Sequence, residues 1–161
     1  MTRGPQPANL PAIKREGAAW HRSFFPLGPG FSVSGRLDRS DLEALARAGV
    51  RTIINNRPDG EDPGQLPAAE ARRIAELHGL VYHHIPITAA TLSRADVDAF
   101  AAALRNSQAP VVAHCRSGTR SALLWALSRM RERADPLALI AEAARHGIDI
   151  ASLPAVSARL R

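Results

Sequence analysis

One cysteine stands in a setting that suits chemistry. Cys115 is the only cysteine of the 161-residue chain, and it opens the segment Cys115–Ser121, which also holds two arginines, two serines, a threonine and a glycine. A tight loop of this kind directs successive backbone N–H groups inward and so forms a cradle for an anion. Gly118 permits the positive φ that such a turn needs. Arg120 offers a planar fork of donors to an oxyanion.

The elements on either side of this loop are expected to favour a reactive thiolate. Pro110–His114 is short and apolar, as an interior parallel strand is, and a strongly apolar helix follows from Ser121. The positive end of the helix dipole then points at the loop and favours the thiolate over the thiol. A thiolate beside an oxyanion cradle is what nucleophilic catalysis uses. We therefore predict that Cys115 and Arg120 are catalytic, and that Cys115 is not a buried filler.

Several other residues of the loop are candidates for binding an anionic substrate. Arg116 either contacts the anion or lies solvated at the rim. Ser121 either hydrogen-bonds the thiolate or serves as the N-cap of the helix, and its position favours the N-cap. The backbone N–H groups of the loop complete the predicted cradle, and its remaining members are Ser117, Gly118 and Thr119. A lone cysteine supplies no structural zinc site, so we expect no metal and no organic cofactor.

A second group of polar residues follows the neighbouring predicted strand. Asn55 and Arg57 begin a stretch of turn residues and are expected to line the pocket or to hold the catalytic loop. Glu61 and Asp62 act as acid or base only if this stretch folds over the site. His114, next to Cys115 in an extended segment, points to the other side and is expected to brace the loop.

The elements that must position these residues alternate along the chain. Such alternation predicts an α/β fold with a short, mostly parallel sheet flanked by helices, in which ligands bind at the carboxyl ends of the strands. Ser40 and Glu43 form a capping-box signature for the first helix. Strands are expected at 31–35, 50–54, 81–87 and 110–114, and helices at about 40–49, 67–77, 93–104, 121–133 and 135–147, with a last short helix after 152.

Composition sets the domain organisation and narrows the partners. Hydrophobic residues make up 45% of the chain, which is enough for one folded domain. We expect a proline-containing leader over residues 1–29, partly disordered or packed on the domain through Trp20, Phe24 and Phe25, and a single catalytic domain over residues 30–161.

The charge pattern points to a small anionic substrate. The net charge is +6, but the arginines are scattered and aromatics make up only 4% of the chain, which argues against nucleic-acid binding. No apolar run reaches the length of a membrane span, so we expect a cytoplasmic protein with no membrane partner. The sequence predicts no particular protein partner.

The motifs resemble two enzyme families and combine in a third. The loop Cys115–Ser121 resembles the active loop of rhodanese-type sulfurtransferases, whereas the order of elements resembles the protein tyrosine phosphatases, above all the dual-specificity type. Together with Ser34-Gly35 and Asn55–Glu61, these features resemble the phosphatase-like domain of β-lactamase-hydrolase-like proteins. The resemblance covers about residues 30–150 and implies a phosphatase-like fold with a cysteine nucleophile.

Two departures from the phosphatase pattern bear on the chemistry. Phosphatases of this fold place five residues between the cysteine and the arginine, but four separate Cys115 from Arg120. They also carry an aspartate as general acid after the third strand, where Pro86–Leu92 contains no carboxylate and the nearby Asp96 pairs with Ser93 as a capping box.

We interpret both departures as favouring sulfur transfer. In this hypothesis a persulfide on Cys115 carries sulfur from thiosulfate or another persulfide to an acceptor. The alternative is a phosphatase that hydrolyses phosphotyrosine or small phosphomonoesters through a thiophosphate on the same cysteine. A non-catalytic module that binds anions is the second alternative.

Overall fold

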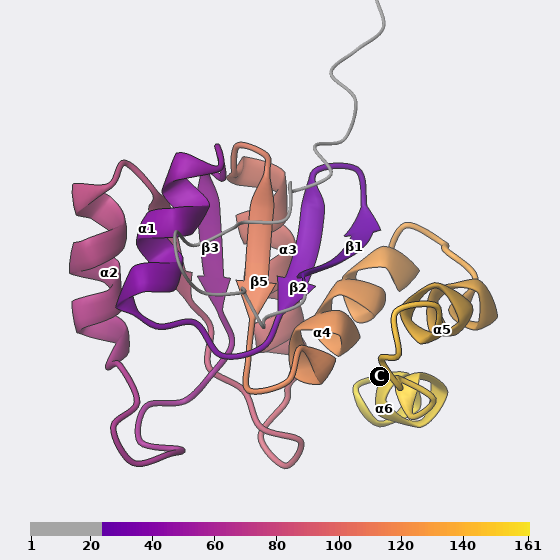
Figure 1. The fold of residues 1–161 in the computed structure, drawn as a ribbon. Helices are drawn as coiled ribbons and strands as arrows, with labels where there is room; N and C mark the ends of the chain where they lie inside the picture. The colour runs from indigo at the N-terminus through magenta and orange to yellow at the C-terminus, as the bar shows by residue number, and fades with distance from the viewer. Residues whose placement is uncertain (1–23) are drawn as a thin grey trace, which may run out of the picture.

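A five-stranded sheet lies between two layers of helices (Figure 1) in the computed structural model, which describes residues 24–161. The strand order is β1-β2-β5-β3-β4, with β1 antiparallel to β2 and the other neighbours parallel. This arrangement confirms the predicted α/β class and the mostly parallel sheet. The strands are β1 (Phe24–Gly28), β2 (Phe31–Ser34), β3 (Thr52–Asn55), β4 (Val81–His84) and β5 (Val111–His114).

The helices divide between the two faces of the sheet. Ile53 and Val112 belong to the core under α1 and α2, whereas Ile54 and Ala113 belong to the core under α3 and α4, because successive side chains of a strand point to opposite faces. No helix in residues 24–161 combines the length and the apolar character that crossing a bilayer demands. The helices are α1 (Arg39–Arg47), α2 (Ala68–Leu77), α3 (Arg94–Asn106), α4 (Thr119–Met130), α5 (Pro136–Ala144) and α6 (Leu153–Arg159).

Helix α4 is covered on most sides, which explains its apolar sequence. It lies on β2 and β5, contacts α3, and is covered in turn by α5 and α6 (Figure 1). Residues from 121 to 128 are nearly all buried as a result. The helix that follows Cys115 is therefore a fixed part of the core, and its first turn gives the loop a rigid base.

The first helix begins two residues earlier than its sequence signature predicted. Asp38 is the N-cap: its side chain accepts from the Asp41 N–H, and the Asp41 carboxylate accepts from the Asp38 N–H. The predicted box of Ser40 and Glu43 is wrong. Both pairs have the same spacing, and the observed start places Leu42 and Leu45 against the core.

The strand β1 lies in a segment for which no strand was predicted. Phe24 pairs with Ser34 and Phe25 with Val33, so β1 forms the antiparallel edge of the sheet. The expectation for Trp20 falls outside the described residues. The division into a leader and a catalytic domain stays a prediction.

Candidate active site

The loop from Cys115 to Gly118 joins β5 to α4 and holds the sulfur at the start of the helix. Cys115 is buried, and its N–H donates to the carbonyl oxygen of Ser34 at 3.3 Å. The N–H of Gly118 donates to Cys115 Sγ at 3.0 Å. Gly118 has φ +96° and is the N-cap of α4, a conformation that glycine adopts without strain. The sulfur therefore lies where a backbone N–H and the helix dipole both stabilise negative charge.

The end of β2 fixes the other side of the loop. A Cβ atom at Gly35 would lie 3.1 Å from the carbonyl oxygen of Arg116, so the two backbones approach closely only because position 35 is glycine. The N–H of Arg36 donates to the same carbonyl oxygen at 3.3 Å. The Ser34-Gly35 pair thus supports the loop of Cys115 directly.

Ser121 has a different place from the one its position in the sequence suggested. It lies in the first turn of α4, which begins at Thr119, so the prediction that Ser121 is the N-cap is wrong. Its buried hydroxyl donates to Asn56 Oδ1 at 2.8 Å, and Asn56 Nδ2 donates to the carbonyl oxygen of Ile85 at 3.0 Å. Ser121 therefore directs its proton to the neighbouring loop and not to the sulfur.

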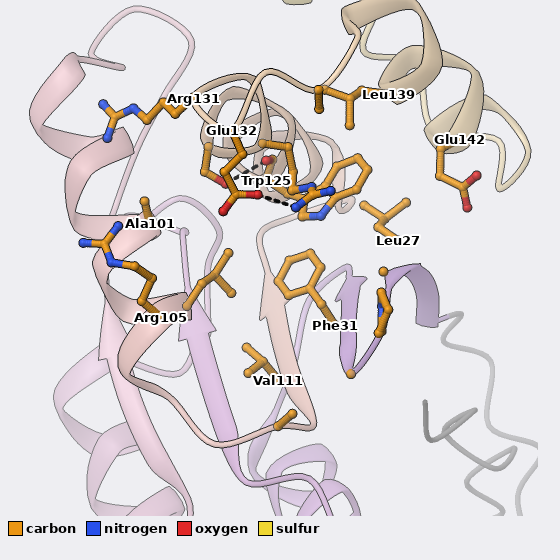
Figure 2. A pocket seen from close by; sticks show the side chains of 18 of the residues that line it. Leu27, Phe31, Ala101, Arg105, Val111, Trp125, Arg131, Glu132, Leu139 and Glu142 are labelled. Atoms are coloured by element: carbon orange, nitrogen blue, oxygen red, sulfur yellow. Dashed lines mark hydrogen bonds and ion pairs between the residues drawn. The ribbon is translucent and has the colours of Figure 1, made fainter. Parts of the chain in front are cut away.

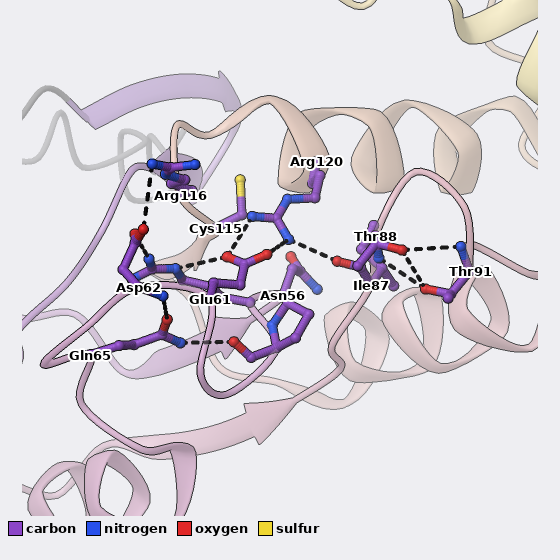
Figure 3. Close-up of polar contacts among 12 residues, drawn as sticks. Asn56, Glu61, Asp62, Gln65, Ile87, Thr88, Thr91, Cys115, Arg116 and Arg120 are labelled. Atoms are coloured by element: carbon purple, nitrogen blue, oxygen red, sulfur yellow. Dashed lines mark hydrogen bonds and ion pairs between the residues drawn. The ribbon is translucent and has the colours of Figure 1, made fainter.

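Arg120 connects the catalytic loop with the loops on either side of it (Figure 3). Its Nη1 and Nη2 donate to the two carboxylate oxygens of Glu61 at 2.7 and 2.9 Å, and Nη1 also donates to the carbonyl oxygen of Ile87 at 2.8 Å. The hydrogen bonds that Arg120 donates to Glu61 raise the pKa of Arg120, and the nearby Cys115 contributes in the same direction. Two partners therefore hold the guanidinium beside the sulfur.

Glu61 is the main site residue whose role was predicted only on the condition that its loop folds over the site. Arg57 Nε donates to Glu61 Oε1 at 2.9 Å. The hydrogen bond from Arg120, and after it the one from Arg57, lowers the pKa of Glu61 against the opposing effect of burial. Glu61 is thus held as a carboxylate. The feature that could have identified Glu61 is its place after β3. This strand pairs in parallel with β5, so the ends of both strands lie at one edge of the sheet.

Arg57 is buried and already paired. Its side chain is 6% exposed, and its guanidinium also forms an ion pair with Asp62. It therefore orients the two carboxylates, whereas the sequence had suggested that it binds the substrate or holds the loop.

Asn55 is also buried and serves the loop that follows it. Its Nδ2 donates to the Tyr82 hydroxyl at 2.9 Å, and its Oδ1 accepts from the Arg57 N–H at 2.8 Å. Burial raises the pKa of Tyr82 to about 12, so this hydroxyl stays neutral. Asn55 supports Arg57 from the side of the sheet that carries α1 and α2.

The outer edge of the loop is polar and accessible. Arg116 is 58% exposed, and its Nη2 lies 3.4 Å from Asp62 Oδ1. The hydroxyl of Ser117 donates to that of Thr119 at 3.3 Å, and both are exposed. Arg116 is therefore the predicted anion contact with the greatest freedom to turn towards a substrate.

The connection between β4 and α3 forms the opposite flank. The hydroxyls of Thr88 and Thr91 lie 2.9 Å apart, and Ser93 with Asp96 caps α3 in the predicted capping box. The residues from 85 to 93 include no carboxylate.

A separate apolar cavity of about 790 Å³ lies at the other end of the sheet (Figure 2). Phe31 and Trp125 stack within it, with ring centroids 6.5 Å apart, and Leu27 and Leu139 also line it. The residues at its floor begin β2 and β5, whereas Cys115 follows the far end of β5. Within residues 24–161, no group of three or more side chains is arranged to hold a metal ion.

Comparison with known sequences gives a consistent result. Residues 23–132 match the family model for the "Beta-lactamase hydrolase-like protein, phosphatase-like domain". The chain is 37% identical over 122 residues to a beta-lactamase hydrolase-like protein of Xylella fastidiosa, which covers 74% of this chain and 28% of that protein. A protein of the same description from Agrobacterium fabrum is 36% identical over 96 residues, covering 60% of this chain and 22% of the other. The chain thus spans about a quarter of the length of the curated relatives it matches.

Solved structures agree with the sequence comparison. A crystal structure of a candidate phosphatase from Neisseria meningitidis has a TM-score of 0.75 and 32% identity, covering 85% of this chain and 97% of that one. Kinase-associated phosphatase has a TM-score of 0.64 over 87% of this chain and 95% of its own, at 18% identity. At 18% identity, the second match shows only that the fold is shared.

Proposed function

Since the chain belongs to the family of phosphatase-like domains of beta-lactamase hydrolase-like proteins, we propose that it hydrolyses phosphate esters with Cys115 as the nucleophile. One observation supports this most strongly. The sulfur accepts the Gly118 N–H at 3.0 Å, beside an arginine that Glu61 and the Ile87 carbonyl hold in place. This arrangement provides a nucleophile and a donor fork at one point, as phosphoryl transfer requires.

The proposed reaction has two steps. The thiolate attacks phosphorus, the S–P bond forms, and the bond to the leaving oxygen breaks. Water then attacks the phosphocysteine, and the electron pair of the S–P bond returns to Sγ, where the Gly118 N–H stabilises it. Arg120 stabilises the non-bridging oxygens in both steps, and Arg116 and the N–H groups of Ser117 and Thr119 contribute further donors.

Sulfur transfer, which the loop length had favoured, receives no support from the relatives. The family description and the solved neighbours name phosphatases, so the phosphatase alternative is now preferred. A four-residue spacing does not by itself fix which anion the loop accepts, because the size of the cradle also depends on where Arg120 is held.

Two assays on the purified chain test the proposal. We expect p-nitrophenyl phosphate hydrolysis that Cys115→Ser abolishes, and no comparable transfer of sulfur from thiosulfate to cyanide. Ser128→Ala, which removes a buried hydroxyl bonded to the Trp125 carbonyl oxygen in the same helix, is the matched control and should retain activity. Hydrolysis that survives Cys115→Ser, or sulfur transfer that depends on Cys115 without hydrolysis, would contradict the proposal.

A further inference from the structure

The proposed reaction as described includes no group that supplies a proton to the leaving oxygen. When the P–O bond breaks, an alkoxide leaving group needs a proton, and a positioned acid contributes roughly 10²–10⁴-fold to the rate. A leaving group that is itself a phosphate needs none, because its second pKa is only about 6. The groups around Cys115 therefore bear on which substrates the site can cleave.

The three carboxylates that follow β3 all have hydrogen-bond or ion-pair partners. Glu61 binds Arg57 and Arg120. Asp62 pairs with Arg57 and lies 3.4 Å from Arg116 and 3.8 Å from Arg36. Asp59 accepts from the Ala68 N–H and so caps α2. The hydrogen bonds from Arg120 and Arg57 lower the pKa of Glu61, and the other two carboxylates are occupied by the donors just named, so this side places no acid at the leaving group.

The side of β4 offers no acid either. The segment from 85 to 93 contains no carboxylate, and Asp96 is occupied by the N–H and the hydroxyl of Ser93. His84 Nε2 lies 2.9 Å from the carbonyl oxygen of Arg57, so this nitrogen donates its proton there. Among the described residues of both flanks, no side chain is placed to protonate an alkoxide.

The same region has an excess of positive charge. Within residues 24–161, the guanidiniums of Arg36, Arg57, Arg116 and Arg120 form ion pairs with two carboxylates, Glu61 and Asp62. With the proposed Cys115 thiolate counted as well, one positive charge is not balanced. Arg36 and Arg116 are 57% and 58% exposed, and exposed pairs at such distances are weak. These two guanidiniums are thus free to bind a second anionic group beside the one that Arg120 holds.

We propose that the site cleaves phosphoanhydrides, in which the leaving group is a phosphate, in strong preference to alkyl phosphate monoesters. The inference rests on the proposed phosphatase function and names its substrate class. Cys115 Sγ attacks the terminal phosphorus, the S–P bond forms, and the electron pair of the bridging P–O bond leaves with the second phosphate, which Arg36 and Arg116 bind. Water then releases dihydrogen phosphate and restores the thiolate, so that both its protons end on the product.

Three substrates and one double variant test the proposal. Inorganic pyrophosphate, glycerol 2-phosphate and p-nitrophenyl phosphate are compared by kcat/KM on the wild-type chain, without added metal. We expect pyrophosphate to exceed glycerol 2-phosphate by at least about 100-fold, the low end of what an acid contributes. Arg36→Ala with Arg116→Ala should lower the ratio of pyrophosphate to p-nitrophenyl phosphate turnover about tenfold or more. Arg47→Ala, an exposed arginine paired with Glu43, should leave that ratio unchanged.

The outcomes distinguish a failure of the anhydride proposal from a failure of the phosphatase proposal on which it rests. Equal turnover of pyrophosphate and glycerol 2-phosphate, or an unchanged ratio in the double variant with an unaltered Tm, overturns the inference. If p-nitrophenyl phosphate is hydrolysed with Cys115 but pyrophosphate is not, the phosphatase proposal stands and the anhydride proposal fails. If none of the three is hydrolysed with Cys115, the phosphatase proposal itself fails.

Discussion

The two loops beside Cys115 differ sharply in charge. The β3–α2 loop, residues 56–67, brings Arg57, Glu61 and Asp62 to the catalytic loop in a set of ion pairs. The β4–α3 loop, residues 85–93, has no charged side chain and contacts Arg120 only through the Ile87 carbonyl oxygen. Both loops leave the carboxyl ends of neighbouring parallel strands, so their position in the sheet does not cause the difference.

This contrast gives the two loops different tasks. The β3–α2 loop holds the arginine through Glu61, whose pKa the hydrogen bonds from Arg120 and Arg57 lower. The β4–α3 loop shapes the other wall without supplying a proton. We expect a site built in this way to bind and attack an anion, and to rely on the substrate for a good leaving group.

Replacing Arg120 should have the largest effect, because this residue touches both loops. Arg120→Lys keeps the charge but removes the fork that binds Glu61 and the Ile87 carbonyl together. We expect kcat/KM for p-nitrophenyl phosphate to fall about 10²–10³-fold. Arg129→Lys, at an exposed position further along α4, is the matched control. Activity within about threefold of the wild type in Arg120→Lys would show that the fork is not used in the transition state.

Removing the charge of Glu61 on the β3–α2 loop should lower activity less than replacing Arg120 does. Glu61→Gln weakens the hold on Arg120, and misplacing a catalytic group costs up to about 100-fold. We expect kcat to fall about tenfold and KM to change less, because Glu61 is a positioning residue. Glu61→Asp should restore part of the loss. A change confined to KM, or no rescue by aspartate, would contradict this role.

The pH dependence of stability gives a second measure of Glu61. Its pKa is lowered by Arg120 and Arg57, so its contribution to the free energy of unfolding is complete above the ordinary glutamate value of about 4.3 and is lost as pH falls through the lowered value. Urea unfolding should therefore show that the wild type loses its advantage over Glu61→Gln only in acid. An equal difference at pH 7 and pH 3 would show that charge is not the cause.

A carboxylate added to the β4–α3 loop should have the smallest effect on turnover. It would remove the difference in charge between the two loops. Thr88→Asp can keep the turn, since its side chain can accept from the Thr91 N–H as Thr88 Oγ1 does at 3.2 Å. We expect glycerol 2-phosphate turnover to rise a few-fold, up to about tenfold, which is below the contribution of an optimised acid. Thr88→Asn is the isosteric control. A gain in both variants would assign the effect to shape and not to proton donation.

The local parts of the site could be predicted from the sequence. The strand before Cys115, the helix after it and the turn at Gly118 follow from a short apolar run, an apolar helix and one glycine, all within about twenty residues. The Ser93 and Asp96 capping box was also predictable, because both of its members lie in one turn. The box of Ser40 and Glu43 failed because Asp38 and Asp41 have the same spacing, and only packing of the helix decides between them.

The ion pairs of the site could not be predicted, because they join distant segments. Arg120 and Glu61 are 59 residues apart, and Ser121 and Asn56 are 65 apart. Spacing rules describe neighbours on one helix or strand and carry no information about such pairs. The preference for sulfur transfer had the same weakness. It rested on the count of residues between Cys115 and Arg120 and on the missing carboxylate after the third predicted strand, and not on how Glu61 positions the arginine.

Trapping of the covalent intermediate tests the central claim most directly. The wild-type chain is mixed with p-nitrophenyl phosphate, quenched within the first turnover and digested, and the peptide that contains Cys115 is analysed by mass spectrometry. We predict a phosphoryl group on Cys115 that forms and decays at rates compatible with turnover, and that is absent from Cys115→Ser. Turnover with an unmodified Cys115, or with the phosphoryl group on another residue, would contradict it.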